Sequence, residues 1–121
     1  MMDVLREAVT RLSRVPGVSG ALVAELEAGV PVVAELKPQI SGTAVAALAA
    51  ALYQRTAQAS DAAGYRELQT LQLDAEHGHV LMADAGELLV IALVEDDKQI
   101  GRVRTEAVRA AQAVRGTMGS A

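Results

Sequence analysis

Residues 42–59 constrain the fold of this chain more than any other segment, because they predict a helix whose first half has no polar side. Residues 44–52 consist only of alanine, valine and leucine. Alanine is the strongest helix former, since it loses no side-chain entropy in a helix. Ser41 precedes this run and is suited to cap the helix by accepting a hydrogen bond from a backbone N–H of the first turn.

Hydrophobic spacing divides this helix into two faces. A stripe at i, i+3, i+4 and i+7, which is typical of a face turned toward a core, consists of Val45, Leu48, Ala49 and Leu52. The opposite face is formed by Ala46, Ala47, Ala50 and Ala51. A helix that is apolar all round is normally buried all round, and a chain of 121 residues has little left to cover a second face.

Small side chains let a second backbone approach closely, so we expect the alanine face to contact the same helix of a second copy of the chain. The predicted interface on this helix comprises Val45, Ala46, Ala47, Leu48, Ala50 and Ala51. The alternative is that the alanines are simply exposed to solvent, which costs little free energy.

Composition indicates an ordered domain and excludes several function classes. Hydrophobic residues make up 51% of the chain and charged residues 21%, which is typical of a globular protein. We expect one domain at residues 1–116 and a frayed tail at 117–121. The formal charge of −4 and the absence of Phe and Trp argue against nucleic-acid binding. The absence of cysteine excludes disulfides, zinc–thiolate sites and thiol catalysis.

The chain shows no pattern for export or membrane insertion. Its first residues are charged where a signal peptide has an apolar core, and its longest apolar run, residues 88–94, is far shorter than a membrane span. We therefore expect a cytoplasmic protein.

Hydrophobic periodicity and turn residues predict eight elements. Pro16-Gly17 ends the first helix, and Ala28-Gly29 is a candidate hairpin turn. The predicted helices are 3–14, 42–59 and 98–115, the last of them stopped by Gly116; the predicted strands are 18–27, 30–36, 66–74, 79–83 and 88–94.

The last strand decides the layers of the fold. Residues 88–94 are apolar without alternation, so both faces of this strand are buried and helices lie on both sides of the sheet. The short turns between strands make them antiparallel. The expected fold is an α+β sandwich of order α-β-β-α-β-β-β-α. Its five-stranded antiparallel sheet carries the middle helix on one face and the terminal helices on the other. Strand 66–74 is half polar, which indicates a sheet edge or a subunit boundary.

No residue cluster predicts catalysis, a metal or a cofactor. His77-Gly78-His79 lacks an evident third ligand, so an ordinary polar hairpin is favoured over a zinc site. Glu95-Asp96-Asp97 directly precedes a helix, where acidic residues cap free N–H groups. Neither a phosphate-binding glycine loop nor a nucleophile elbow occurs.

Several segments together resemble a known family. Residues 12–23, Leu-Ser-Arg-Val-Pro-Gly-Val-Ser-Gly-Ala-Leu-Val, resemble the start of roadblock-type dynein light-chain domains, where a first helix runs through a PGV-x-GA step into the first strand. The turn at Gly29, the helix around Leu48 and residues 99–104 are similar to the rest of that pattern. The first turn departs from it, with Ala28-Gly29 where the family often has Asp-Gly. The resemblance covers residues 5–114.

The resemblance implies a homodimer or heterodimer in which the middle helices pair across a two-fold axis and the third strands join the two sheets. It therefore adds Leu68, Thr70 and Gln72 to the expected interface. It also implies a function, because bacterial members are regulatory partners of Ras-like small GTPases and eukaryotic members are adaptors in motor and signalling complexes.

The resulting hypothesis is a non-enzymatic dimeric adaptor or regulator that binds a Ras-like small GTPase. The candidate rim for this partner comprises Tyr53, Gln54, Arg55 and Gln58, for which an ordinary solvated helix end is the alternative. Arg55 is not assigned as a catalytic arginine finger. Two other functions stay open. One is a small-molecule sensor, disfavoured because ligand pockets usually contain aromatic residues; the other is a structural scaffold subunit.

Overall fold

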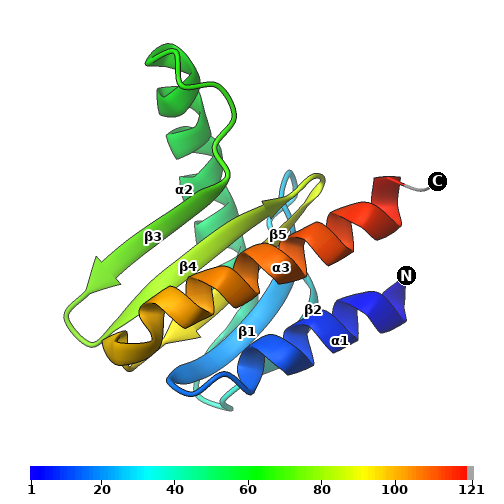
Figure 1. Ribbon diagram of the computed structural model, residues 1–121, viewed down its shortest axis with the longest axis vertical. Helices are drawn as coiled ribbons and strands as arrows, with labels where there is room; N and C mark the ends of the chain where they lie inside the picture. Colours follow the sequence, from blue (N-terminus) through cyan, green and yellow to red (C-terminus); the bar gives the residue numbers. More distant parts are fainter. Residues whose placement is uncertain (120–121) are drawn as a thin grey trace.

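The order of helices and strands in the structure matches the expected order. The structure is a computed structural model that describes residues 1–119, so residues 120–121 of the expected tail lie outside the described part. Its elements are α1 (Met2–Ser13), β1 (Val18–Glu25), β2 (Val30–Leu36), α2 (Gly42–Ala62), β3 (Thr70–Ala75), β4 (Gly78–Ala85), β5 (Leu88–Val94), the short 3₁₀ helix η1 (Asp97–Gln99) and α3 (Ile100–Gly119) (Figure 1).

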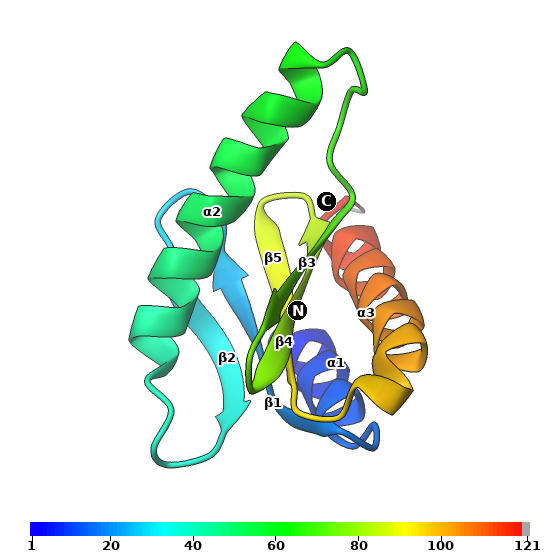
Figure 2. The same ribbon diagram turned by 90° about the vertical axis from the view of Figure 1, so that its left-hand side faces the viewer.

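The strands form one sheet in the order β2-β1-β5-β4-β3, and every neighbouring pair is antiparallel. Helices α1 and α3 lie side by side on one face, and α2 lies on the other (Figure 2). This confirms the expected α+β sandwich. Strand β5 is central and lies between two helical layers, which explains why it is apolar without alternation.

Side chains of β5 alternate between two hydrophobic cores. Val90 packs with residues of α1 and α3, including Leu12 and Val103. Leu89 and Ile91 pack on the opposite side with residues of α2. The larger core lies under α1 and α3, and the smaller one lies under α2.

Two boundaries near the C-terminal end of α2 differ from the prediction. The helix continues past its expected end at residue 59 to Ala62, and β3 starts at Thr70 instead of residue 66. Arg66 has a φ of +67°, in the left-handed region, and its carbonyl accepts a hydrogen bond from Ser60 Oγ at 2.9 Å. This turn ties residue 66 to the end of α2 and prevents it from joining the sheet. The C-terminal half of α2 consequently projects beyond the sheet (Figure 2).

The other differences are at element ends. Strand β1 stops at Glu25, and β4 is longer than expected, from Gly78 to Ala85. Helix α3 continues to Gly119 through Gly116, which was expected to stop it. Glycine lowers helix stability without forbidding the helix, since only its greater loss of conformational entropy opposes the helical geometry.

The β1–β2 turn requires glycine at position 29. Gly29 has a φ of +67°, and a Cβ added there would lie 3.1 Å from the Cα of Ala47 in α2. We expect Gly29→Ala to lower the free energy of unfolding by about 1–2 kcal/mol, because an L-residue is strained in this conformation. Gly116→Ala is the matched control; its added Cβ lies in the last turn of α3 and meets no atom within 4 Å, so it should raise the stability by at most about 0.5–1 kcal/mol. Urea unfolding of both variants tests this, and a neutral Gly29→Ala would contradict it.

Candidate interaction surface

Helix α2 packs on the sheet through small residues and one tyrosine. Its start is as expected, since Ser41 Oγ accepts a hydrogen bond from the backbone N–H of Ala44 at 3.2 Å. The buried residues of α2 are Ala46, Ala49, Ala50 and Tyr53, which also follow the i, i+3, i+4, i+7 spacing. Leu48 is 71% exposed and Leu52 37%. The prediction that Leu48 and Leu52 face the core while Ala46 and Ala50 face away was therefore wrong.

Close packing explains this orientation. The Cα of Ala47 lies beside the β1–β2 turn, and this approach leaves no room for a side chain at position 29. Ala46 and Ala49 join the core cluster that contains Leu22 and Ile91. Alanines let the helix lie low on the sheet, and the leucines are left on the outer side.

Tyr53 holds the middle of α2 against the segment that leads into β3. Its ring is buried, and its hydroxyl donates a hydrogen bond to the carbonyl of Leu68 at 2.5 Å, just before β3. Burial raises the pKa of the Tyr53 phenol, and the nearby Asp84 carboxylate raises it further. Tyr53 was expected on a partner-binding rim; instead it joins α2 to the segment leading into β3.

The remaining three rim candidates differ in their exposure to solvent. Gln54 is half-buried, and its Nε2 donates a hydrogen bond to the carbonyl of Leu26 in the β1–β2 turn at 2.5 Å. Arg55 and Gln58 are exposed on the projecting half of the helix. Of the four candidates, only these two present their side chains fully to a partner.

An apolar surface stays open on the α2 side of the molecule. We call it the open face, and it consists of Ala47, Leu48, Ala51 and Leu52 on α2 and Leu73 on β3. Leu73 is 44% exposed and is paired across the sheet with Val80, which is itself paired with Leu93. Val80 and Leu93 are only partly buried against the α2-side core. The sequence analysis did not include Leu52 and Leu73 in the interface. Tyr53, a large aromatic residue on the same stripe as Ala46, Ala49 and Ala50, was the sequence feature that could have indicated which side of α2 meets the sheet.

The edge of β3 is also open. Within residues 1–119, strand β3 ends the strand order, so one row of its backbone N–H and C=O groups has no neighbouring strand, as expected from its half-polar sequence. The side chain of Gln72 faces α3, where its Oε1 accepts a hydrogen bond from Arg104. Of the three edge residues predicted for an interface, Thr70 and Gln72 lie on β3, whereas Leu68 lies before it and its carbonyl accepts the hydrogen bond from Tyr53.

Asp74, at the end of this edge, should titrate below its ordinary range. Hydrogen bonds from Gln72 Nε2 at 2.8 Å and with His79 Nδ1 at 2.7 Å lower the pKa of its carboxyl below 3.8. The folded pKa is depressed, so the stabilisation is present above pH 3.8 and is lost as the pH falls through the folded value. Carbon-13 NMR titration should show this pKa and its return toward 3.8 in Gln72→Ala. An unchanged pKa in that variant would contradict the assignment of the amide as the main cause.

The other clusters singled out in the sequence have structural roles. Asp96 Oδ1 accepts a hydrogen bond from the backbone N–H of Lys98 at 3.0 Å, which confirms capping in the 95–97 acidic run. Within residues 1–119, no three His, Cys, Asp or Glu side chains are arranged to hold a metal ion. In the same range, no helix has the length and apolar character needed to cross a membrane.

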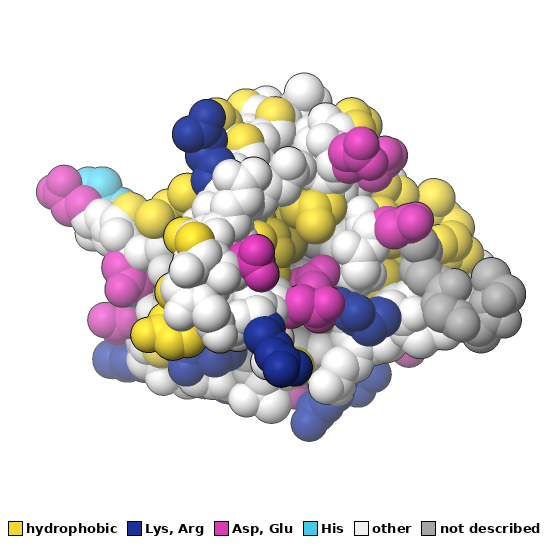
Figure 3. Space-filling model, turned by 90° about the horizontal axis from the view of Figure 1, so that it is seen from above, with side chains coloured by type: hydrophobic (Ala, Val, Ile, Leu, Met, Phe, Trp, Pro, Cys, Tyr) yellow, Lys and Arg dark blue, Asp and Glu magenta, His cyan; other side chains and the backbone are white. Residues whose placement is uncertain are grey.

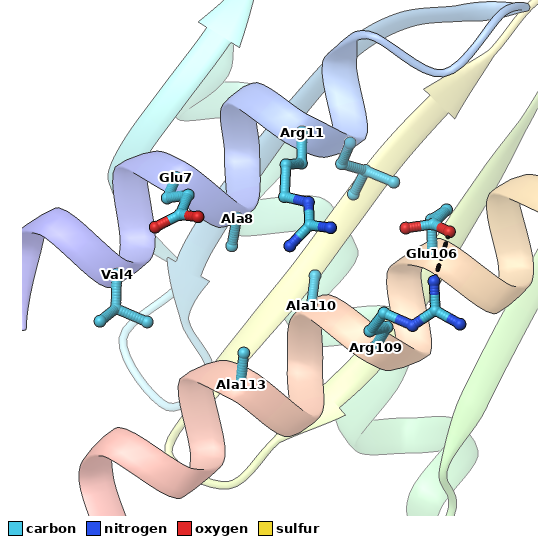
Figure 4. Close-up of a pocket in the computed structure, with 9 residues that line it drawn as sticks. Val4, Glu7, Ala8, Arg11, Glu106, Arg109, Ala110 and Ala113 are labelled. Carbon is cyan, nitrogen blue, oxygen red and sulfur yellow. Dashed lines mark hydrogen bonds and ion pairs between the residues drawn. The ribbon is translucent and has the colours of Figure 1, made fainter.

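A small cleft lies between α1 and α3 on the other face of the molecule (Figure 4). Arg11 and Glu7 of α1 border it opposite Arg109, whose guanidinium donates a hydrogen bond to Glu106 Oε1 at 2.8 Å. Its volume of about 140 Å³ is below the range of about 300–1,000 Å³ for small-molecule pockets. The cleft therefore gives no support to a sensor of drug-sized ligands.

The family of this fold follows from comparison with known proteins. Residues 5–95 match the model of the Roadblock/LC7 domain. The chain belongs to the Roadblock/LC7 domain family. This confirms the resemblance inferred from the sequence.

Similar proteins align with this chain over nearly its whole length. The uncharacterized protein MJ0714 of Methanocaldococcus jannaschii is 27% identical, over 93% of this chain and 95% of its own. The solved structure of MglB from Myxococcus xanthus superposes with a TM-score of 0.84 at 16% identity, over 97% of this chain and 96% of that chain. The gliding protein MglB from Thermus thermophilus gives a TM-score of 0.81 at 20% identity, over 98% and 91% of the two chains. At these identities the structural likeness shows the shared Roadblock/LC7 fold alone.

Proposed function

We propose that this Roadblock/LC7 domain is a non-enzymatic, cytoplasmic homodimeric adaptor that binds a Ras-like small GTPase in a signalling or polarity complex. The observation that carries the proposal is the open face together with the open edge of β3. Soluble monomers rarely leave contiguous apolar surface uncovered, and such surfaces mark protein–protein contacts. A second copy of the chain can cover both features at once.

A two-fold axis next to β3 would both pair the open strand edge and cover the open face. Antiparallel pairing of β3 with its symmetry mate satisfies the free backbone groups and makes one continuous sheet. Leu48 and Leu52 of each copy are then covered by the α2 helix of the other. The proposed interface comprises Val45, Ala47, Leu48 and Ala51 on α2 and Leu68, Thr70 and Gln72 at the edge, while Ala46 and Ala50 support α2 from the sheet side.

The GTPase is proposed from the family resemblance and is supported by the fold shared with the MglB proteins. Arg55 and Gln58 are the side chains of this chain proposed to contact it, because they are exposed beside the open face. The domain would act by positioning the partner, since no residue is assigned a chemical step. A purely structural scaffold and a small-molecule sensor are the remaining alternatives.

Two measurements test this proposal in order. Light scattering over a dilution series should give the mass of two chains. Calorimetry should then show binding of this dimer to a Ras-like GTPase of the same organism, with different affinity for the GDP form and for the form loaded with a non-hydrolysable GTP analogue. The Arg55→Glu variant should weaken this binding and keep the dimer mass. A dimer that binds none of these GTPases in either nucleotide state would reject the GTPase partner and favour the scaffold.

A further inference from the structure

A larger groove lies at the end of the sheet where the β1–β2 turn, the β4–β5 turn and the start of α1 meet. Its volume is about 900 Å³. Apolar side chains form its floor, among them Met2, Leu5, Leu26, Val32 and Leu88. Figure 3 views this end of the molecule and shows apolar and acidic side chains adjoining one another on it.

The rim of this groove is acidic. Glu25, Glu27 and Glu87 border it, all three are exposed, and no Lys or Arg is among its lining residues. Within residues 1–119, none of these three carboxylates forms an ion pair. A cationic group entering the groove would therefore meet uncompensated negative charge above an apolar floor.

The backbone around the groove is held in place. The N–H of Leu26 donates a hydrogen bond to the carbonyl of Glu87 at 3.0 Å, which joins the two turns. Gln54 Nε2 donates to the carbonyl of Leu26 at 2.5 Å and fixes the same turn to α2. The methionine side chains are the adaptable part of the floor, because an unbranched thioether fits irregular partners. The lining comes mainly from the start of α1 and from the β1–β2 and β4–β5 turns with their flanking residues, and none of it comes from β3.

We propose that this groove is a second docking site, which takes a segment of a partner protein bearing aliphatic side chains flanked by lysine or arginine. The floor selects the aliphatic groups and the three glutamates select the flanking cations. The same glutamates repel anionic lipid surfaces and nucleic acids, which leaves a cationic peptide as the matching occupant. The proposal does not depend on the dimer or on the GTPase, since none of the three glutamates belongs to the open face.

The test uses the whole protein and three short fluorescent peptides: one with leucines flanked by lysines, one with its lysines changed to glutamates, and one with its leucines changed to serines. Anisotropy should show binding of the first peptide and at least about tenfold weaker binding of the other two. Methyl NMR should show shifts at Leu26, Val32 and Leu88 on titration with the first. Equal binding of the serine peptide, or shifts confined to other parts of the surface, would overturn the proposal.

Charge-reversal variants distinguish the effect of the groove glutamates on peptide binding from the effect of the protein's net charge. Glu25→Lys combined with Glu87→Lys should weaken binding of the first peptide at least about tenfold. The control is Glu76→Lys combined with Asp61→Lys, which makes the same change in net charge at exposed residues that do not line the groove. Val32→Asp, which charges the apolar floor, should also weaken binding, and circular dichroism should show that every variant is folded. Equal weakening by the control pair, or stronger binding of phosphatidylglycerol vesicles than of the peptide, would overturn the proposal.

Discussion

Replacing Leu48 with lysine should convert the protein from two chains to one in solution without unfolding it. Leu48 is the most exposed leucine of the open face, at 71%, so the monomer accommodates the ammonium group in water. In the proposed dimer the same group would be buried against the partner's helix without a counter-charge. We expect the dissociation constant to rise at least about 100-fold, which corresponds to about 2.8 kcal/mol. Light scattering over a dilution series measures this change.

Val30→Lys is the matched control for that experiment. Val30 is 52% exposed on β2, the strand at the opposite edge of the sheet, so it loses a comparable aliphatic side chain outside the open face. Its dissociation constant should stay within about twofold of the unmodified protein, as expected for a residue outside the contact. If Leu48→Lys keeps the mass of two chains at every concentration, the open face is not the subunit contact.

Replacing Ala46 with aspartate should instead destabilise the fold itself. Ala46 is fully buried in the cluster that contains Leu22 and Ile91, and an aspartate side chain is too short to reach water from there. We expect the free energy of unfolding to fall by at least about 3 kcal/mol, because an unpaired buried charge costs several kcal/mol. Urea unfolding followed by circular dichroism measures this loss.

The control for this second variant is Ala59→Asp. Ala59 is exposed on the projecting half of the same helix, so this substitution carries the same loss of helix propensity without burial of the charge. It should cost less than about 1 kcal/mol. Similar losses for both variants would show that α2 is not packed on the sheet through Ala46.

The two proposed docking sites differ in chemistry. The open face is aliphatic and has a free strand edge, which suits a second copy of the same chain. The groove above the β1–β2 and β4–β5 turns has an acidic rim, which suits a cationic partner. An adaptor with both could hold its dimer partner and a different protein at the same time.

The sequence predicted correctly those features that depend on the polarity of a short segment or on one capping residue. Residues 88–94 indicated a strand covered on both faces, and the structure places β5 at the centre of the sheet between two helical layers. Asp96 in the acidic run indicated a cap, and it caps η1. The half-polar segment before residue 75 indicated an edge, and β3 is an edge strand. The turn at Arg66 was missed, because a positive φ in an arginine leaves no mark in composition or periodicity.

The sequence by itself determined the order of the elements and the layering of the sheet, because period-two and helical spacings are local properties of the chain. It could not determine which side of α2 meets the sheet. Two stripes of that helix fit the same spacing, and the larger hydrophobic residues favoured the wrong one. The tertiary structure decided between them through two contacts: the close approach of Ala47 to Gly29, and the hydrogen bond from Tyr53 to the carbonyl of Leu68. Both join residues far apart in the chain, and their geometry turns Ala46, Ala49 and Ala50 inward and leaves Leu48 and Leu52 on the surface.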